Sequence, residues 1–379
     1  MAKLGEVCTI VSGSTPKTSV TSYWDGNIKW ITPAELNEDT FYIMDSVRHI
    51  TEEGKEKTGL SYLPTGTVIL SSRAPIGKTA IAGCEMCCNQ GFKNLICSDA
   101  IYNEYLYFFL KSKTDYLNSL GRGATFKEIS KSIVENIEIP LPEVNQQKEI
   151  AEKFKKLEQL ISLRKQQLAK LDELVKTRFV EMFGESEYPC NSLISLIIEG
   201  AGLSYGIVQP GDDGTGDMGV LRPVDFADGK IKTDSIKYID RSLGNGFKKT
   251  ELNGNELLIT VRGTTGITAL TDSRFKGMNV TRGIAVIRYD EKKIDPIYLN
   301  EYLKMEESQK YIKEHTRGAT LQQINLSDLR DLKVMVPPLL LQQAFSTFVE
   351  RVDQQKQTVQ QSLEKLELMK KALMQEYFG

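Results

Sequence analysis

A phrase of eight residues occurs twice in this chain, as RGATFKEI at residues 122–129 and as RGATLQQI at residues 317–324. Its offset of 195 residues (317 − 122) persists without a gap to the end of the sequence, where EYFG at 376–379 repeats EMFG at 181–184. A period of this length excludes a solenoid, whose units are a few tens of residues long. The chain therefore has to fold as two copies of one large module.

The two copies match closely in their tails and loosely in their fronts. Ahead of the shared phrase the register drifts: VILSSR at 68–73 faces LLITVR at 257–262, an offset of 189 residues (257 − 68). Divergent fronts with constant tails indicate different tasks for the fronts and one shared task for the tails. We predict two front domains and two tails, with the boundaries 1–144, 145–184, 185–339 and 340–379.

The tails have the periodicity of long helices. In the first tail, apolar residues recur at intervals of three, four or seven, which is the 3.5-residue period of a coiled coil. They occupy positions 150, 154, 157, 161, 168, 171, 175 and 182. No proline lies between Glu143 and Tyr188, and none follows Pro338. Each helix can therefore reach about 38 residues, or roughly 57 Å.

A helix of this length with one apolar stripe needs a partner. It could pack on its own front domain, but we favour an antiparallel pair of tails, because each tail carries the chain from one front domain towards the next. Such a pair would hold two homologous domains at opposite ends of a rod with pseudo-twofold symmetry. The residues expected to pack between the helices are Ile150, Phe154, Leu157, Ile161, Leu168, Leu171, Phe345, Val349, Val352, Val359, Leu363 and Leu366.

The front domains combine short strands with short helices. Residues 67–70 and 256–261 are apolar runs typical of buried strands, and residues 137–141 alternate with a period of two. Helical patterns cover residues 102–113 and 297–307. Without regular β-α-β alternation, a doubly wound sheet is not indicated. The fold class that we expect is α+β, with two mixed α/β front domains separated by the helix pair.

The repeated phrase has the form of a helix start preceded by an arginine. Thr125 with Glu128, and Thr320 with Gln323, fit a capping box at a helix N-terminus. A cation at this place opposes the helix dipole, but an arginine beside free backbone N–H groups is suited to holding a phosphate. Arg122 and Arg317 are therefore candidates for phosphate contact, and a salt bridge that locks the turn is the alternative.

The sequence lacks the signatures of common enzymes. It contains no Walker loop, no zinc-protease motif, no nucleophile elbow, and no Asn-Pro-Pro-aromatic or Asp-Pro-Pro-aromatic signature of an amino-group DNA methyltransferase. The glycines at 214, 216 and 219 match a dinucleotide loop only as letters, because no strand precedes them and no helix follows. A binding or scaffolding chain fits these observations better than an enzyme.

The cysteines and the net charge bear on metal binding and on the partners of the chain. Cys84, Cys87 and Cys88 lie close together, but a structural zinc site needs four ligands, so buried or loop cysteines are the preferred interpretation and no metal is expected. The formal net charge of −2 is unusual for a chain that binds nucleic acid alone. No signal peptide and no apolar run of membrane-spanning length is present, so we expect a cytoplasmic protein without membrane contact.

Taken in order, these features resemble the specificity subunit of type I restriction-modification enzymes. The resemblance covers the whole chain: Gly-Ala-Thr in the repeated phrase, the strand at 137–142, the long helix from Gln146 and the terminal Phe-Gly, all in duplicate. It implies that each front domain is a target-recognition domain that reads one half of a split DNA sequence. The helices would set the spacer between the half-sites and dock the other subunits.

The resemblance also implies partners and a cofactor. Double-stranded DNA and two methyltransferase subunits are the expected partners, and restriction or translocase subunits can join them. S-adenosylmethionine is expected on the methyltransferase subunits and no cofactor on this chain. Partners that share the phosphate load would account for the mild acidity. Two pseudo-symmetric domains should place their half-sites about one helical turn apart, roughly 10 base pairs.

Candidate DNA contacts follow from paired positions in the two front domains. Arg73 and Arg262 end matching strands, in loops where a guanidinium could grip a phosphate or a guanine. Gln90 faces Arg282, a difference that would change base preference from adenine towards guanine. The full set of candidates is Thr32, Arg73, Lys78, Gln90, Arg122, Arg222, Arg262, Thr264, Thr281, Arg282 and Arg317. For each of them, a solvated or salt-bridged loop residue is the alternative.

Two other functions stay open on the sequence alone. A self-contained DNA methyltransferase with an unfamiliar active site would bind S-adenosylmethionine as an isolated chain. A coiled-coil adaptor without a DNA role would tolerate alanine at Arg73, Arg262 and Arg282. A non-catalytic, sequence-reading subunit is the function that we favour.

Overall fold

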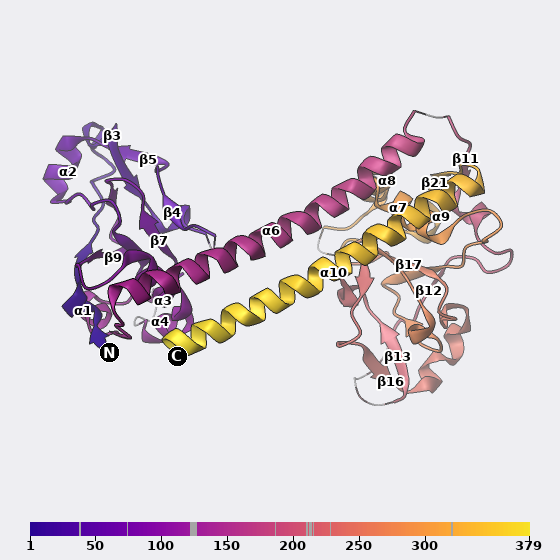
Figure 1. Ribbon diagram of the computed structural model, residues 1–379. Coiled ribbons are helices and arrows are strands. Elements are labelled where there is room, and N and C mark those ends of the chain that lie inside the picture. The colour runs from indigo at the N-terminus through magenta and orange to yellow at the C-terminus, as the bar shows by residue number, and fades with distance from the viewer. Residues whose placement is uncertain are drawn as a thin grey trace. The chain divides into compact units, whose positions relative to one another are not determined.

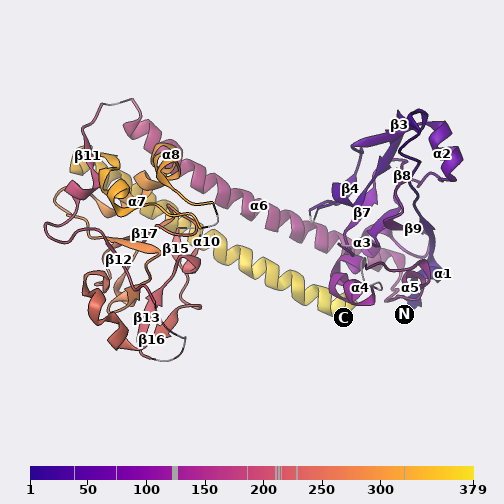
Figure 2. The same cartoon turned by 180° about the vertical axis from the view of Figure 1, so that it is seen from behind.

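A computed structural model of the chain describes all residues except 38, 74, 122–126, 186, 210, 212–213, 215, 228 and 320. The chain divides into two compact units. Unit 1 consists of Met1–Gln166 and Gln360–Gly379, and unit 2 of Gln167–Val359. Each unit thus combines one front domain with a part of each long helix. Figures 1 and 2 show the elements of both units from opposite sides.

The front domain of unit 1 has two main sheets. The larger sheet has the order β2-β9-β6-β7-β4 and is antiparallel except between β4 and β7. These strands are β2 (Cys8–Ser12), β4 (Tyr42–Ile43), β6 (Val68–Ser71), β7 (Thr79–Ala82) and β9 (Phe92–Cys97). The strands β6 and β7 are buried along their whole length, which explains their continuous apolar runs. The front domain therefore has its core on both faces of this sheet.

The second sheet of unit 1 is smaller and has one parallel pair. It has the order β5-β3-β8, with β3 parallel to β8. Its strands are β3 (Trp24–Ile31), β5 (Arg48–Ile50) and β8 (Cys87–Cys88). Trp24 and Trp30 meet edge to face, with ring centroids 5.1 Å apart, so both are packing residues. The remaining elements are β1 (Ala2–Lys3), α1 (Leu4–Val7), η1 (Thr21–Tyr23), η2 (Pro33–Glu35), α2 (Glu52–Thr58), α3 (Asn103–Ser112), α4 (Thr114–Leu120), α5 (Lys131–Glu135) and β10 (Glu138–Ile139).

Unit 2 repeats this plan. One sheet has the order β12-β20-β17-β18, with the strands β12 (Ser204–Tyr205), β17 (Leu257–Thr260), β18 (Thr268–Leu270) and β20 (Ile284–Ile287). The other has the order β16-β13-β19, with β13 (Met218–Leu221), β16 (Lys237–Ile239) and β19 (Asn279–Val280), and β13 is parallel to β19. The other elements are β11 (Cys190–Ser192), η3 (Leu193–Leu196), η4 (Pro223–Asp225), β14 (Phe226–Ala227), β15 (Lys230–Ile231), η5 (Arg241–Thr250), η6 (Ser273–Phe275), α7 (Pro296–Lys304), α8 (Glu306–His315), α9 (Leu326–Asp331) and β21 (Lys333–Met335).

The two front domains share individual hydrogen bonds as well as strand order. The hydroxyl of Tyr105 on α3 donates to the carbonyl of Pro140 at 2.9 Å. At the matching place in unit 2, the hydroxyl of Tyr298 on α7 donates to the carbonyl of Met335 at 3.0 Å. The prediction of two homologous mixed α/β domains is therefore confirmed, even though their sequences match only loosely.

Each tail is one continuous helix. The helix α6 spans Val144–Phe183 and α10 spans Leu339–Phe378. Within unit 1 their segments run antiparallel: Phe154 stacks on Phe378, with ring centroids 5.6 Å apart, while Lys165 lies 3.8 Å from Glu367. Neither helix combines the length and hydropathy needed to cross a membrane, and among the described residues no other helix does.

The helix segments in unit 2 pair in the same antiparallel sense. Phe179 and Phe345 lie edge to face at 5.5 Å, and Lys356 forms an ion pair with Asp172 at 2.5 Å. The pseudo-twofold relation between the two units concerns their mutual placement and stays a prediction. Within each unit, however, the pair of long helices is present as expected.

The predicted interface positions lie in these helix pairs. Ile150, Phe154, Leu157, Ile161, Phe345, Val349, Val352, Val359 and Leu363 are buried. Leu168, Leu171 and Leu366 are half-buried. The pattern missed Phe179, Phe183 and Phe378, which are also buried, because aromatic residues of α3 and α7 widen the apolar stripe near the helix ends.

A buried glutamine ties the start of each long helix to its front domain. The amide of Gln147 donates to the carbonyls of Ala100 and Pro142 at 3.0 and 2.8 Å, and its oxygen accepts from the N–H of Tyr102 at 2.8 Å. Gln342, which is 195 residues further on, donates to a proline carbonyl and accepts from a backbone N–H in the same way. The neighbouring glutamine of each pair is exposed. The shared glutamine therefore has a structural reason to recur.

The capping boxes predicted in the repeated phrase are wrong. Their N-caps, Thr125 and Thr320, lie outside the described residues, but residues 127–129 and 321–324, which would belong to the first turn, are not helical. Glu128 and Gln323 instead form isolated β-bridges with Arg73 and Arg262. The helices start later, at α5 with Ser130 as its N-cap and at α9 with Asn325 in that place. Glu128 and Gln323 pair with the residues that follow β6 and β17, and this pairing takes the place of a helix.

Candidate nucleic-acid interface

Three loops and the end of the repeated phrase come together in unit 1. The N–H of Asn89 donates to the carbonyl of Ile31 at 3.0 Å, and the N–H of Ser72 donates to the carbonyl of Gly91 at 2.7 Å. The N–H of Ile129 donates in turn to the carbonyl of Ser72 at 3.0 Å. We call residues 31–36, 71–73 with 75–78, 89–91 and 127–129 the first loop cluster.

Unit 2 has the same cluster, held by the same bonds. The N–H of Thr281 donates to the carbonyl of Leu221 at 2.9 Å, and the N–H of Val261 donates to that of Gly283 at 2.8 Å. Ile324 donates to the carbonyl of Val261 at 3.0 Å. The second loop cluster comprises residues 221–226, 260–267, 281–283 and 322–324. Each cluster thus gathers four chain segments with a fixed backbone and variable side chains.

Two glycines keep each cluster compact. A Cβ on Gly91 would lie 3.0 Å from Pro33, and a Cβ on Gly283 would lie 2.6 Å from Pro223, so these positions admit no side chain without rearrangement. The second glycine of each pair, Gly77 or Gly266, has a φ of 97° or 87°. This is the left-handed region that glycine adopts without strain. The recurrence of these glycines therefore follows from packing and backbone geometry.

An ion-pair chain runs through the first loop cluster. Glu128 accepts from the Nε of Arg73 at 2.9 Å with one carboxylate oxygen and from the Nζ of Lys93 at 3.2 Å with the other. Burial would raise the pKa of Glu128, but the hydrogen bonds from both cations outweigh this effect and hold its pKa below the usual 4.5. The side chain of Lys93 is 8% exposed and that of Arg73 is 44% exposed. The three charged side chains therefore connect a buried cation, Lys93, to an exposed one, Arg73.

The second loop cluster lacks this ion-pair chain. The residue opposite Arg262 is the neutral Gln323, whose backbone bridges to both Arg262 and Arg317. Within the described part of unit 2, the guanidinium of Arg262 has no ion pair or side-chain hydrogen bond. The paired arginines thus share a backbone position but differ in their electrostatic surroundings.

Thr32 and Arg222 mark the same turn but carry different side chains. The backbone N–H of Thr32 donates to Glu35, and that of Arg222 to Asp225, both at 2.7 Å. The guanidinium of Arg222 also bonds to Asp225 at 3.0 Å and to the carbonyl of Ser235 at 2.5 Å. A side chain bound to its own loop in this way is less available for a base than an exposed one.

Lys78 and Gln90 point partly into the first cluster. The ammonium of Lys78 donates to the carbonyl of Leu36 at 2.6 Å and to that of Pro33 at 3.3 Å, so it braces the cluster. The side-chain oxygen of Gln90 accepts a hydrogen bond from the hydroxyl of Thr15.

The matching candidates of the second cluster are more open. Arg282 and Thr264 are exposed, and Thr281 is half-buried. The side chain of Arg317 is 72% exposed, with its nearest acid, Asp328, 3.9 Å away. Arg122 lies outside the described residues. Arg73, Arg262 and Arg282 are therefore well placed to reach a ligand, since each lies in a loop cluster and Arg73 and Arg282 are exposed while Arg262 is half-buried.

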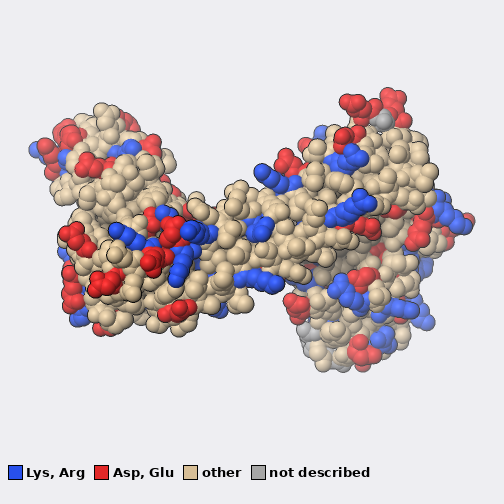
Figure 3. All heavy atoms as spheres, viewed as in Figure 1, with Lys and Arg blue, Asp and Glu red and all other residues tan. Residues whose placement is uncertain are grey.

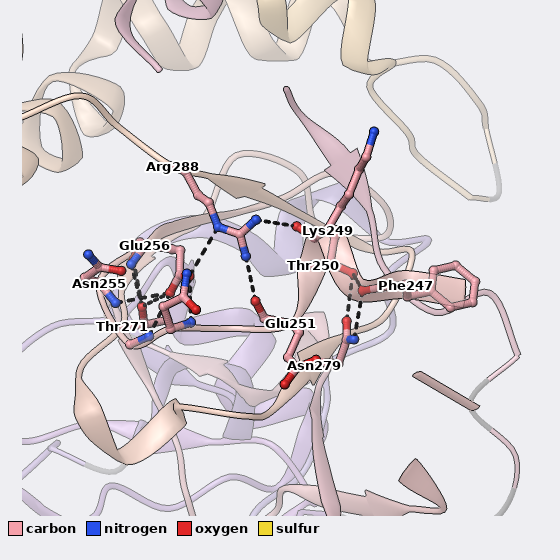
Figure 4. A network of polar contacts seen from close by, with 11 residues as sticks. Phe247, Lys249, Thr250, Glu251, Asn255, Glu256, Thr271, Asn279 and Arg288 are labelled. Carbon is pink, nitrogen blue, oxygen red and sulfur yellow. Dashed lines mark hydrogen bonds and ion pairs between the residues drawn. The ribbon is translucent and has the colours of Figure 1, made fainter. Parts of the chain in front are cut away.

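A buried polar network in unit 2 was not anticipated as a unit (Figure 4). The carboxylate of Glu256 is fully buried and accepts from the N–H groups of Asn253, Gly254 and Asn255 at 2.7, 3.0 and 3.1 Å. The only signal in the sequence was an acidic residue at the head of an apolar strand run. A buried carboxylate needs such partners, because an unpaired one would be strongly destabilising.

Arg288 extends this network to the end of η5 (Figure 4). Its Nε lies 3.5 Å from Glu256, and its two Nη atoms donate to the carbonyls of Lys249 and Glu251 at 2.8 and 2.6 Å. The exposed Lys248 and Lys249 lie in the last turn of η5. In unit 1 the corresponding helix, α2, also has lysines in its last turn, Lys55 and Lys57, but its first turn carries two glutamates. The two helices therefore share a basic last turn and differ in the charge of their first turn.

The chain carries nearly equal numbers of acidic and basic residues, and two of the three clustered cysteines are buried. On the face drawn in Figure 3, basic and acidic side chains are interspersed over each unit. Among the described residues, no group of three or more His, Cys, Asp and Glu side chains could hold a metal ion. Burial raises the pKa of the Cys87 thiol to about 11 and that of Cys88 to about 12, so both are protonated at neutral pH.

Comparisons with known proteins agree with this architecture. Residues 1–173 and 215–368 match the family described as type I restriction modification DNA specificity domain. The MjaIX type I restriction enzyme specificity subunit of Methanocaldococcus jannaschii is 29% identical over 377 residues, which cover 92% of this chain and 85% of that protein. The EcoBI specificity subunit of Escherichia coli is 24% identical over 67% of this chain and 59% of its own length.

Solved structures share the fold. A chain from a structure of the type I R-M system aligns over 100% of this chain and 96% of its own length, with a TM-score of 0.64 and 18% identity. The S subunit of the type I restriction-modification system of M. genitalium aligns over 100% and 95%, with a TM-score of 0.56 and 16% identity. At these identities the likeness concerns the fold alone.

Proposed function

Since the chain belongs to the type I restriction modification DNA specificity domain family, we propose that it is the sequence-reading subunit of such a system. Each front domain would bind one half of a bipartite DNA target through its loop cluster. The chain itself would carry out no catalysis. This proposal assigns the two divergent domains to two different half-sites and explains why their backbones agree while their exposed side chains differ.

The observation that supports the proposal is the pairing of the loop clusters. The same four segments meet through the same backbone hydrogen bonds in both units, yet Arg73 faces Glu128 where Arg262 faces Gln323. Gln90 similarly takes the place of Arg282. A fixed frame with exchanged hydrogen-bonding side chains is what two related readers of different sequences need, because base edges are distinguished by donors and acceptors.

The long helices would set the spacer and bind the partner subunits. A spacer of constant length would follow if α6 and α10, whose segments pair within each unit, pair along their whole length. Two methyltransferase subunits would dock on the constant tails, carry S-adenosylmethionine and methylate the target. Restriction subunits would join the same assembly. Sharing of phosphate contacts with these partners would account for a formal net charge of −2 in a DNA-binding chain.

A map of DNA methylation tests the proposal. Methylated adenines would be mapped across the genome of the source cell with and without this gene, leaving neighbouring genes intact. Loss of one split motif on deletion is the expected result and reveals both half-sites at once. An unchanged map, in cells shown to make this protein and its methyltransferase, would refute the proposed function and support an adaptor without a DNA role.

A further inference from the structure

We propose that Arg73 reads a guanine in the major groove and that Glu128, held by the buried Lys93, positions it for this contact. The inference rests on the proposed function and names the base that the first loop cluster prefers. It concerns one residue of the cluster and leaves the other contacts of the half-site open.

The geometry of the ion pair leaves the reading edge of Arg73 free. Its Nε donates to Glu128 at 2.9 Å, whereas its two Nη atoms have no hydrogen bond to any residue within the described parts of unit 1. Two parallel N–H groups of one guanidinium match the O6 and N7 acceptors of guanine. With 44% of its side chain exposed, Arg73 can present this edge outside the protein.

Glu128 is itself fixed, which is what a positioning residue requires. Its second carboxylate oxygen accepts from Lys93, which belongs to the central strand β9 and is 8% exposed. The backbone of Glu128 also bridges to Arg73, so the two residues are held at both main chain and side chain. An arginine pre-oriented in this way loses less conformational freedom when it meets a base.

A purely structural role for the ion pair would be the neutralisation of Lys93, and the contacts argue for more. Neutralising a buried cation needs one carboxylate oxygen, and Lys93 uses one. The other oxygen accepts a hydrogen bond from Arg73, which is not required for the hydrophobic core. In unit 2 the position of Lys93 is taken by Ala285, that of Glu128 by Gln323, and the arginine is kept without a carboxylate. The arginine is thus the shared feature, and its support is specific to the first domain.

The test uses the assembled complex and DNA duplexes that carry the motif found by methylation mapping. Each guanine of both half-sites is replaced in turn by 7-deazaguanine, which lacks N7, or by hypoxanthine, which keeps N7 and O6. Binding is measured for the unaltered protein, Arg73→Lys, Glu128→Gln and, as the matched control in the other unit, Arg262→Lys. Lysine keeps the charge at position 73 but lacks the planar pair of parallel N–H groups of a guanidinium.

We expect one guanine at which 7-deazaguanine, which removes one of the two acceptors, weakens binding by the unaltered protein, by less than the roughly 150-fold upper range for loss of a whole bidentate contact. Hypoxanthine at that guanine should weaken binding much less. Arg73→Lys should bind natural DNA more weakly than the unaltered protein does and should respond less to 7-deazaguanine at that position. Glu128→Gln should lose part of the discrimination. Arg262→Lys should keep the discrimination at this guanine, since Arg262 belongs to the loop cluster of unit 2.

Three results would overturn the inference while leaving the proposed function intact. One is a mapped motif whose half-sites contain no guanine on either strand. Another is an Arg73→Lys variant that discriminates 7-deazaguanine at every guanine as well as the unaltered protein does. The third is tighter binding by Glu128→Gln, which would mean that the carboxylate restrains Arg73 instead of positioning it. An unchanged methylation map on gene deletion would instead refute the proposed function itself.

Discussion

Replacing Gln147 by leucine should destabilise unit 1, because it removes three hydrogen bonds from a fully buried site while nearly conserving volume. The change would leave the carbonyls of Ala100 and Pro142 and the N–H of Tyr102 without a protein partner. Each buried group left unpaired costs about 1–3 kcal/mol. Two of the three are carbonyls that keep a second lone pair, so we take about 1 kcal/mol for each, or about 3 kcal/mol together.

Thermal unfolding of the purified chain measures this loss. For a unit of this size, about 3 kcal/mol lowers the Tm by roughly 6–12 °C. Gln146→Leu is the matched control, because it makes the same chemical change at an exposed neighbour and should shift the Tm little. Equal shifts for the Gln146 and Gln147 variants would refute the claim that the buried glutamine ties α6 to the front domain.

Other predictions concern packing, acid stability and DNA contact. Phe154→Ala, which removes a ring stacked on Phe108 and Phe378, should lower the free energy of unfolding by about 3–5 kcal/mol, whereas Leu160→Ala on the exposed side of α6 should change it little in urea titrations. Burial of Glu104 raises the pKa of its carboxyl, but the hydrogen bonds from Tyr42 and Lys155 lower this pKa by more, so it lies below the usual 4.5. The carboxylate therefore contributes its full stabilisation above pH 4.5, and this contribution is lost as the pH falls through the lowered pKa. Glu104→Gln should therefore flatten the loss of stability in acid, and an unchanged pH profile would contradict this. Arg282→Ala should weaken DNA binding and, if it contacts a phosphate, reduce the salt dependence by about one unit of slope, as a binding series at increasing salt would show.

The duplicated tails were predictable because their apolar residues recur with a helical period. One apolar stripe at 3.5-residue spacing has few ways to be buried, so helices at 145–184 and 340–379 and their pairing followed from the sequence, and the structure gives Val144–Phe183 and Leu339–Phe378. The repeated phrase was harder to interpret. Thr-x-x-Glu is a valid capping box in isolation, but the bridge between Glu128 and Arg73 depends on a strand 55 residues earlier, which local patterns do not report.

The loop clusters were only partly predictable for the same reason. Matching positions in the two copies identified the right loops, because a shared fold preserves the order of elements. Which side chains are free depends on the partners that the fold brings to them: Arg73 meets a glutamate from a distant segment, whereas Arg222 folds onto its near neighbour Asp225 and onto Ser235. The network around Glu256 and Arg288 was missed because its ligands are mainly backbone groups, which carry no sequence signature.

The central claim, that each front domain reads one half-site, is tested most directly by exchanging one domain. Residues 1–143 would be replaced by the corresponding segment of the MjaIX specificity subunit, with the long helices of this chain retained, and methylated adenines would be mapped in cells that express the methyltransferase of this system. A motif in which one half changes and the other half and the spacer stay constant is the predicted result. Methylation at a motif changed in both halves, or in neither, would contradict the account.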